Sequence, residues 1–471
     1  MLVKFIVFIF LISYIFTMIV FPFKTVLNNI NSDNIDYNST NYANDYFSQP
    51  AYITLKIGNP SQEVKFLLTY DDCGFKIGKT NKCINNDDYL SHYNRNSSED
   101  FKYTNLFNRT SWEYKNGRSA EDTIYAYTDL EMKNLQKFEN IGFYLGTDTD
   151  DALCGIIGLK PRMYRPYCDN INNIFTSFKS IKIINDNDWM IKYTSENEGL
   201  LILNPDLNKI VKNYDINKLF IMNNDKEKNF DRWKIMIDKV YSQNFNGSIN
   251  NKPLTANINN DFGLFEGSEE YYYNITKTYF KDYILQKICY LDKIKVDLFS
   301  YYAIECDKTK FGIEDMKKFP ILTLVIVPFQ TEFNFDYNDL FTETKYKYFF
   351  NVIFNELITD RWVLGKPFLK KYPLIINYFS ETIGYYNDQN KAEPTDNGEP
   401  GTSGIFSLKI LIFLIIIIII IIVIVSIIFY YIGKNMNQMK KRKANELEDD
   451  YDYTSSKENE KHLYDEPGKI N

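Results

Sequence analysis

A long apolar stretch near the C-terminus, residues 410–432, is the feature that most restricts how this chain can fold. At 1.5 Å per residue a helix of this length extends about 34 Å, enough to cross a bilayer. A basic cluster follows it directly: Lys434, Lys440, Lys441, Arg442 and Lys443. Because positive charge stays on the cytosolic side, we expect a type I single-pass membrane protein with a cytoplasmic tail at residues 433–471.

The N-terminus predicts entry into the secretory pathway. Lys4 precedes an apolar run at residues 5–23, so residues 1–24 are predicted to be a signal peptide or, because no small-x-small cleavage site is present, an uncleaved signal anchor. An N-terminal extension follows at residues 25–48. The main domain would then be lumenal or extracellular, and its glycosylation sequons are at Asn38, Asn96, Asn108, Asn246 and Asn274.

Composition excludes several classes of function. The chain has two histidines, His92 and His462, which argues against a His-based zinc site or a Ser/His/Asp hydrolase. The net charge is −7 and the basic residues are scattered, so we expect no nucleic-acid partner. No C-x-x-C motif is present, and we expect neither a metal nor another cofactor.

All six cysteines lie in the outward-facing portion, as an oxidising compartment favours. Sequential pairing is one of 15 connectivities that six cysteines allow, and it is the one we adopt as a hypothesis. It would join Cys73 to Cys83, Cys154 to Cys168, and Cys289 to Cys306.

The outward-facing portion has the pattern of a mostly β protein. Short hydrophobic segments bounded by Gly, Pro and Asn predict strands at residues 52–57, 64–68, 200–203 and 322–327. Short helices are expected near residues 170–178 and 265–280. A Gly/Pro-rich stalk is expected at residues 391–409.

Five motifs along this portion resemble those of pepsin-like aspartic proteases, the family of plasmepsins and cathepsin D. They are Y-I-T-L-K-I-G-N-P-S-Q (52–62), W-E-Y-K-N-G (112–117), C-G-I-I-G-L (154–159), R-W-K-I-M-I-D (232–238), and W-V-L-G-K-P-F-L-K-K-Y (362–372) with I-G-Y-Y (383–386). The resemblance implies a bilobal acid-protease fold, with β lobes at residues 49–215 and 216–390. It also implies a flap whose Tyr114 and Gly117 contact a bound peptide.

Peptide hydrolysis by this family needs two aspartates about 3 Å apart that share one proton, one from a D-T-G loop in each lobe. Aligned without gaps, the catalytic positions hold Thr69 and Asn259, so the dyad is missing. A shifted alignment instead places Asp72 and Asp261 in D-x-G triplets. The rival interpretation is that Asp72 and Asp261 have no catalytic role, because aspartate is a common residue in turns.

Three functions remain open at this point. The first is a membrane-anchored homologue with lost or impaired peptidase activity, whose cleft binds a peptide or a protein partner. The second is an active aspartic endopeptidase that uses Asp72 and Asp261 on protein substrates in the secretory pathway or at the surface. The third is an adhesion or receptor module on the same scaffold.

Overall fold

The structure is a computed structural model of the 471-residue chain. It describes residues 17–25, 49–78, 93–104, 118–146, 155–161, 173–224, 232–242, 253–296, 299–344, 346–357 and 361–388. The chain divides into two compact units, residues 1–390 and 391–471, and every described residue belongs to the first. The predicted stalk, span and tail lie outside the described residues, within which no helix is long and apolar enough to cross a membrane.

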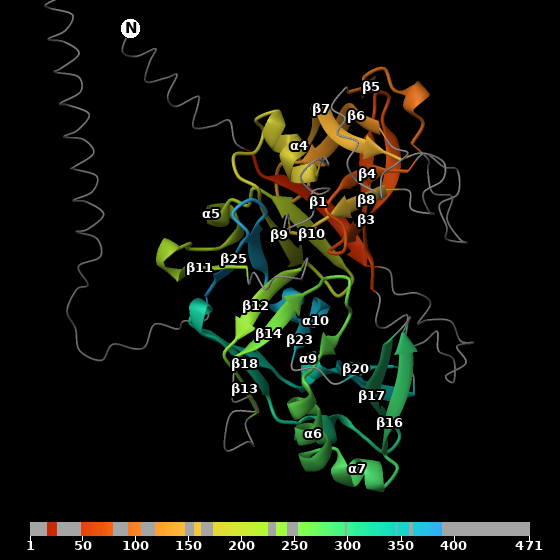
Figure 1. The fold of residues 1–471 in the computed structure, drawn as a ribbon, viewed down its shortest axis with the longest axis vertical. Helices are drawn as coiled ribbons and strands as arrows, with labels where there is room; N and C mark the ends of the chain where they lie inside the picture. The colour runs from red at the N-terminus through yellow and green to blue at the C-terminus, as the bar shows by residue number, and fades with distance from the viewer. Residues whose placement is uncertain are drawn as a thin grey trace, which may run out of the picture. The chain divides into compact units, whose positions relative to one another are not determined.

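Among the described residues the largest sheet has 13 strands and includes the first and the last strand along the chain (Figure 1). Its strands, in spatial order, are β11 (Leu219–Asn223), β25 (Thr382–Tyr386), β24 (Leu374–Asn377), β9 (Asp188–Tyr193), β10 (Glu198–Leu203), β1 (Ile19–Thr25), β2 (Ala51–Ile57), β3 (Gln62–Thr69), β8 (Gly155–Gly158), β4 (Phe75–Ile77), β7 (Leu135–Leu145), β6 (Arg118–Tyr127) and β5 (Lys102–Tyr103).

Two further sheets form the second lobe. The larger contains β12 (Trp233–Ile237), β14 (Leu254–Ile258), β23 (Trp362–Leu364), β15 (Phe265–Glu266), β22 (Val352–Asn355), β17 (Phe299–Asp307), β21 (Lys347–Phe350) and β20 (Phe341–Glu343), with β16 (Cys289–Val296) paired to β17. The smaller contains β13 (Lys239–Ser242), β18 (Leu322–Ile326) and β19 (Thr331–Phe335).

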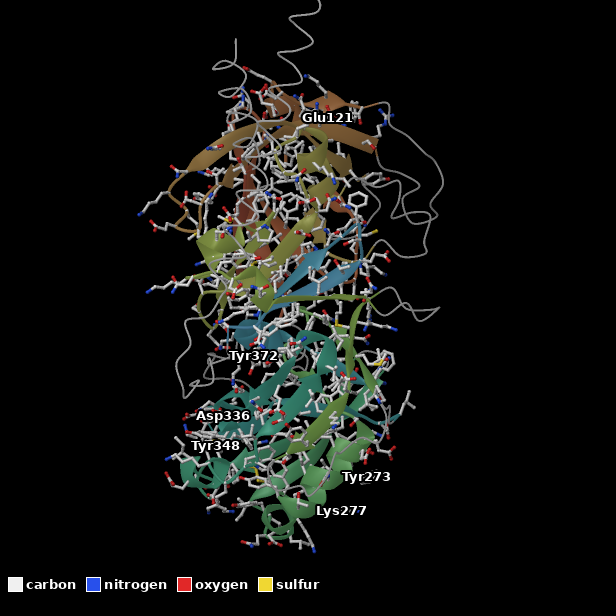
Figure 2. The ribbon with its side chains drawn as sticks, turned by 90° about the vertical axis from the view of Figure 1, so that its left-hand side faces the viewer. Glu121, Tyr273, Lys277, Asp336, Tyr348 and Tyr372 are labelled. Atoms are coloured by element: carbon white, nitrogen blue, oxygen red, sulfur yellow. A yellow bond between two sulfur atoms is a disulfide. The ribbon has the colours of Figure 1, made fainter. Side chains whose placement is uncertain are left out.

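In the described part of the chain helices are few and short, as the sequence predicts. They are η1 (Arg95–Ser97), α4 (Ile174–Ser180), α5 (Leu207–Ile210), η3 (Ile216–Lys218), α6 (Glu269–Thr278), α7 (Lys281–Leu285), α8 (Ile313–Met316), η4 (Val327–Phe329), α9 (Tyr337–Leu340) and α10 (Lys366–Lys371). Glu121 of β6 lies near one end of the unit, and Tyr273 and Lys277 of α6 lie near the other (Figure 2). The prediction of a mostly β, two-lobed domain is therefore confirmed.

The same strand arrangement occurs once in each lobe. In the first, β3 pairs parallel with β8, and β4 then pairs antiparallel with the other side of β8. In the second, β14 pairs parallel with β23, and β15 pairs antiparallel with β23. In each lobe, one loop therefore connects the two strands that flank a short central strand. In the first lobe, residues 70–74 connect β3 to β4, which flank β8. In the second lobe, residues 259–264 connect β14 to β15, which flank β23. These two loops are the ones that the sequence singles out.

Strand β1 falls within the segment that the sequence predicts to be a leader. It pairs antiparallel with β10 from Ile19 to Lys24 and with β2 from Phe23 to Thr25. The side chains of Ile19, Phe21 and Phe23 are buried in the core. Residues 19–24 therefore belong to the folded domain, and the leader prediction can hold only for residues before the strand.

We expect the N-terminus of the mature protein to lie at or before Met18. Removing β1 would expose the buried faces of β2 and β10 and leave their backbone groups without partners, a loss of several kcal/mol. N-terminal sequencing and intact-mass measurement of the purified chain test this expectation. A mature protein that folds and begins at residue 25 would contradict it.

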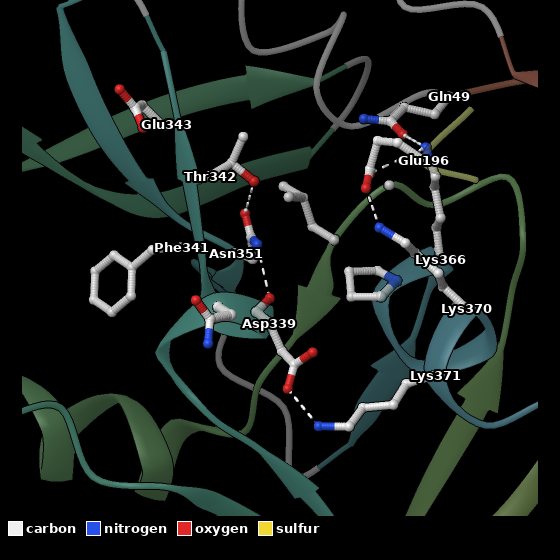
Figure 3. A pocket seen from close by; sticks show the side chains of 14 residues that line it. Gln49, Glu196, Asp339, Phe341, Thr342, Glu343, Asn351, Lys366, Lys370 and Lys371 are labelled. Carbon is white, nitrogen blue, oxygen red and sulfur yellow. Dashed lines mark hydrogen bonds and ion pairs between the residues drawn. The ribbon is translucent and has the colours of Figure 1, made fainter. Parts of the chain in front are cut away.

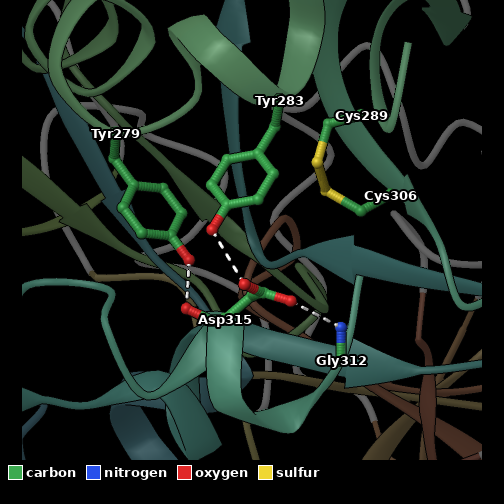
Figure 4. Close-up of a disulfide and its surroundings, with 6 residues drawn as sticks. All are labelled: Tyr279, Tyr283, Cys289, Cys306, Gly312 and Asp315. Carbon is green, nitrogen blue, oxygen red and sulfur yellow. Dashed lines mark hydrogen bonds between the residues drawn. A yellow bond between two sulfur atoms is a disulfide. The ribbon is translucent and has the colours of Figure 1, made fainter. Parts of the chain in front are cut away.

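The disulfide Cys289–Cys306 joins neighbouring strands β16 and β17 beside α7 (Figure 4). It confirms one of the three predicted pairs. Close to it, Asp315 accepts hydrogen bonds from the Tyr283 hydroxyl (3.0 Å) and the Gly312 amide (3.1 Å). Cys73 is also disulfide-bonded, whereas Cys83, Cys154 and Cys168 lie outside the described residues.

Candidate functional site

The two loops meet across the lobes through a threonine and an aspartate. The hydroxyl of Thr69 donates to Oδ2 of Asp261 at 2.6 Å, and the amide of Tyr70 donates to the same oxygen at 2.9 Å. Both donors come from the first lobe and the acceptor comes from the second. One carboxyl group therefore lies where hydrolysis of the pepsin type would need two.

The loops have equivalent backbone geometry. Oγ1 of Thr69 accepts the amide of Asp71 at 3.1 Å, and Oδ1 of Asn259 accepts the amide of Asp261 at 3.0 Å. In each loop the first side chain thus binds the backbone two residues later, a typical local turn bond. Thr69 and Asn259 consequently hold corresponding positions, as they do in the ungapped alignment.

Asp72 is bound within its own lobe. Its Oδ1 accepts the amide of Gly74 at 2.7 Å, and its Oδ2 forms an ion pair with Lys76. In the described part of the chain, no hydrogen bond joins Asp72 to Asp261. The structure brings Asp261 together with Thr69 instead.

The environment of Asp261 favours the neutral acid. Its pKa is raised from 3.8 to about 7, mainly by burial, and the Asp71 carboxylate acts in the same direction. The hydrogen bonds from Thr69 and Tyr70 and the charge of Arg232 act in the opposite direction. Its second oxygen, Oδ1, is buried and has no hydrogen-bond partner among the residues that the structure describes.

Aromatic side chains of β9 in the large sheet contact both loops. The Tyr193 hydroxyl donates to Oδ1 of Asn260 at 2.6 Å, and burial raises the pKa of Tyr193. Tyr70 packs edge-on against Trp189 at 5.7 Å between ring centroids. The sequence gives no signal for Tyr193, because one tyrosine among 38 has no distinguishing neighbour.

A pocket of about 600 Å³ is lined by Gly263 and Leu264 at the end of the second loop (Figure 3). Lys366 and Lys370 lie on one side of it, and Asp339 lies on the other, paired with Lys371 at 2.6 Å. The pocket therefore offers charge of both signs around apolar contacts from Leu264 and Pro367.

Lys366 is a buried cation at the edge of this pocket. Its Nζ donates to Oε1 of Gln49 at 2.8 Å and to Oγ1 of Thr25 and Oδ1 of Asn197 at 3.3 Å each. Burial lowers its pKa from 10.5 to about 8. Sequence reasoning missed this residue, although a lysine inside the hydrophobic W-V-L-G-K-P-F-L motif is a visible anomaly.

The predicted flap residues Tyr114 and Gly117 lie outside the described residues. Among the residues that the structure describes, no group of three His, Cys, Asp or Glu side chains is placed to hold a metal ion.

Two solved seed-protein structures are similar to this chain. Conglutin gamma, a basic 7S globulin from lupine seeds, is 10% identical with a TM-score of 0.51, over 79% of this chain and 95% of that chain. Basic 7S globulin from soybean is 12% identical with a TM-score of 0.49, over the same shares. No protein-family model and no curated protein matches the chain.

The similarity to conglutin gamma shows a mostly β, two-lobed fold and leaves activity open. Identifying the chain as a relative of plasmepsins and cathepsin D is therefore wrong. Conglutin gamma, the structure that carries the fold comparison, is a seed globulin, and no family model or curated protein supports the identification.

Proposed function

We propose that this protein is a membrane-anchored binding protein without peptidase activity, built on a pepsin-like scaffold. The Thr69–Asp261 contact carries the proposal, because one carboxyl group occupies the junction of the two loops. Thr69 can hold a water molecule by hydrogen bonds, but its hydroxyl cannot take a proton from that water near neutral pH.

The ligand class follows from the pocket next to the second loop. Its side chains combine lysines, carboxylates and amides around Leu264 and Pro367. A short peptide segment carries charges of both signs, backbone donors and acceptors, and apolar side chains, so it matches such a lining. We place the ligand there, as a peptide or a loop of a protein partner.

Membrane attachment enters the proposal from the sequence. Residues 410–432 would form the anchor, and the domain would be lumenal or extracellular. This arrangement suits a receptor or adhesion molecule as well as a protein that presents peptides.

The proposal predicts binding without cleavage. We expect the purified full-length chain to enrich peptides from a random library and to leave them uncut between about pH 4 and pH 7. Lys370→Gln, which removes a pocket cation paired with Glu196, should lower the affinity for the enriched peptides about tenfold. Affinity is measured by titration calorimetry and cleavage by mass spectrometry.

The matched control is Lys318→Gln, which removes an exposed lysine paired with Asp315 outside the pocket lining and should leave affinity unchanged. Acid-dependent cleavage that disappears in both Asp72→Ala and Asp261→Ala would overturn the proposal and establish a peptidase. An equal effect of both lysine substitutions would reject the pocket as the binding site.

A further inference from the structure

Strand β11 lies at one end of the large sheet, and in the described part of the chain no strand pairs with its outer edge. Its one partner there is β25, on the inner side (Figure 1). The side chain of Ile221 is 61% exposed, and Asn223 is exposed as well. Another strand can therefore reach the backbone of β11 along this edge.

The hydrogen bonds at the two ends of β25 show which backbone groups of β11 point outward. The amide of Asn224 donates to the carbonyl of Glu381 at 2.8 Å, and the carbonyl of Lys218 accepts the amide of Asn387 at 2.9 Å. Successive residues of a strand turn their backbone groups to alternate sides, so the even-numbered residues from 218 to 224 face β25. The odd-numbered residues of β11 therefore face outward.

These outward residues are Leu219, Ile221 and Asn223. The amide of Leu219 donates to the carbonyl of Ile216 at the end of η3. The carbonyl of Leu219, and the amide and carbonyl of both Ile221 and Asn223, are left to bind a partner strand.

Among the edge strands of the described sheets, β11 alone has no charged residue, since its sequence is L-F-I-M-N. Each of the others, β5, β12, β13, β16, β19 and β20, carries at least one charge: Lys102, Lys234, Lys239, Asp292, Glu332 and Glu343, in that order. Charged side chains on an edge oppose pairing with another chain, whereas an uncharged apolar edge favours it. The edge of β11 is therefore the one that is suited to pairing.

The edge of β11 is also complementary to itself. Two copies can pair antiparallel with Ile221 opposite Ile221 of the partner subunit, and the central residues then exchange both of their N–H···O bonds. In the same register the carbonyl of Leu219 accepts the amide of Asn223 of the partner subunit. Phe220 lies opposite Met222 of the partner subunit, so no like charges face each other.

We propose that β11 is the interface of a homodimer with twofold symmetry, in which the large sheets of two copies of this chain join edge to edge. Such an interface is isologous, with the axis passing between the two Ile221 residues. The pairing uses five residues from each chain, so the interface is small and we expect a dissociation constant roughly in the micromolar range. This dimer requires neither peptide binding nor membrane attachment.

Sedimentation velocity of the full-length chain in a mild detergent measures the association. We expect a reversible dimer at about 100 µM. Ile221→Lys would place two ammonium groups opposite each other at the axis, and it should weaken the dimer roughly tenfold or more. The matched control is Ile216→Lys, because Ile216 is 62% exposed but lies outside the paired strands, and it should leave the association unchanged.

Cross-linking through an added cysteine tests the register, and it does so even if the lysine variant fails to fold. Residues in a hydrogen-bonded antiparallel pair have Cα atoms about 5.5 Å apart, so a short bifunctional thiol reagent should link Ile221→Cys into a dimer. The two copies of Ile216→Cys would be roughly 25 Å apart and should stay unlinked.

Three results would overturn the proposal. The first is a parent chain that remains monomeric at about 100 µM. The second is a dimer that Ile221→Lys and Ile216→Lys weaken equally, and the third is equal cross-linking at positions 221 and 216. Either of the last two would show that the chains associate through another surface.

Discussion

Gly365→Ala is expected to destabilise the domain by roughly 3 kcal/mol, because the added methyl group has no space. A Cβ at this position would lie closer than 3.0 Å to the carbonyl oxygens of Phe262 and Leu264 in the second loop. The loop cannot easily retreat, since the amide of Lys366 donates to the Phe262 carbonyl at 2.8 Å and Asn259 donates to the Leu364 carbonyl at 3.1 Å.

Gly158 has the corresponding place in the first lobe. A Cβ there would approach the backbone of Asp72 and Cys73 within 3.0 Å. The amides of Gly158 and Lys160 donate to the carbonyls of Gly74 (2.8 Å) and Asp72 (2.9 Å), which hold that loop against β8. Gly158→Ala should therefore cost about as much as Gly365→Ala.

Urea unfolding of each variant measures these losses. Gly312→Ala is the matched control, because a Cβ at Gly312 would have no heavy atom within 4 Å. We expect its free energy of unfolding to stay within about 0.5 kcal/mol of the parent. A variant at Gly158 or Gly365 that unfolds like the Gly312 control would contradict the close packing of loop on strand.

These glycines explain why the sequence predicted the fold but misjudged the family. G-I-I-G-L and W-V-L-G carry the residues that let a loop close on its neighbouring strand, and any chain with this strand arrangement needs them. These glycine-containing motifs therefore predict the fold but not the activity. The residues that would report activity, at positions 69 and 259, already departed from the family pattern.

Local patterns were equally reliable for single elements. Residues alternate between buried and exposed along β2, which is the signature that predicted a strand at residues 52–57. The helix expected near residues 170–178 is α4, whose N-cap Asn173 accepts the amide of Thr176 at 2.7 Å. The residues of each such signal lie close together in the sequence, so the signal can be recognised without knowledge of the fold.

The candidate site could not be predicted in the same way, because its contacts join distant parts of the chain. Thr69 and Asp261 are 192 residues apart in the sequence, and Lys366 forms a hydrogen bond with Thr25, which is 341 residues away. Strand β1 shows a second difficulty, which is that one sequence pattern can predict two structures. An apolar run after a positive charge has the composition of a leader and of a buried strand, and only its partners β2 and β10 decide between them.

Asp261→Asn is expected to flatten the dependence of stability on pH. The native carboxyl group has a pKa of about 7, whereas an unfolded aspartate has one near 3.8. Between these values the native state binds a proton that the unfolded state lacks, so the free energy of unfolding falls as pH rises. A shift of about three pKa units corresponds to a loss of about 4 kcal/mol by pH 8.

Asparagine keeps the shape of the neutral acid and its acceptor oxygen for the Thr69 hydroxyl and the Tyr70 amide, but it cannot ionise. The variant should match the parent near pH 4 and exceed its stability by several kcal/mol near pH 8, as measured by urea unfolding at each pH. Asp292→Asn, on the exposed strand β16, should follow the parent at every pH. If Asp261→Asn loses stability equally at all pH values, the carboxylate rather than the neutral acid is the form that joins the lobes.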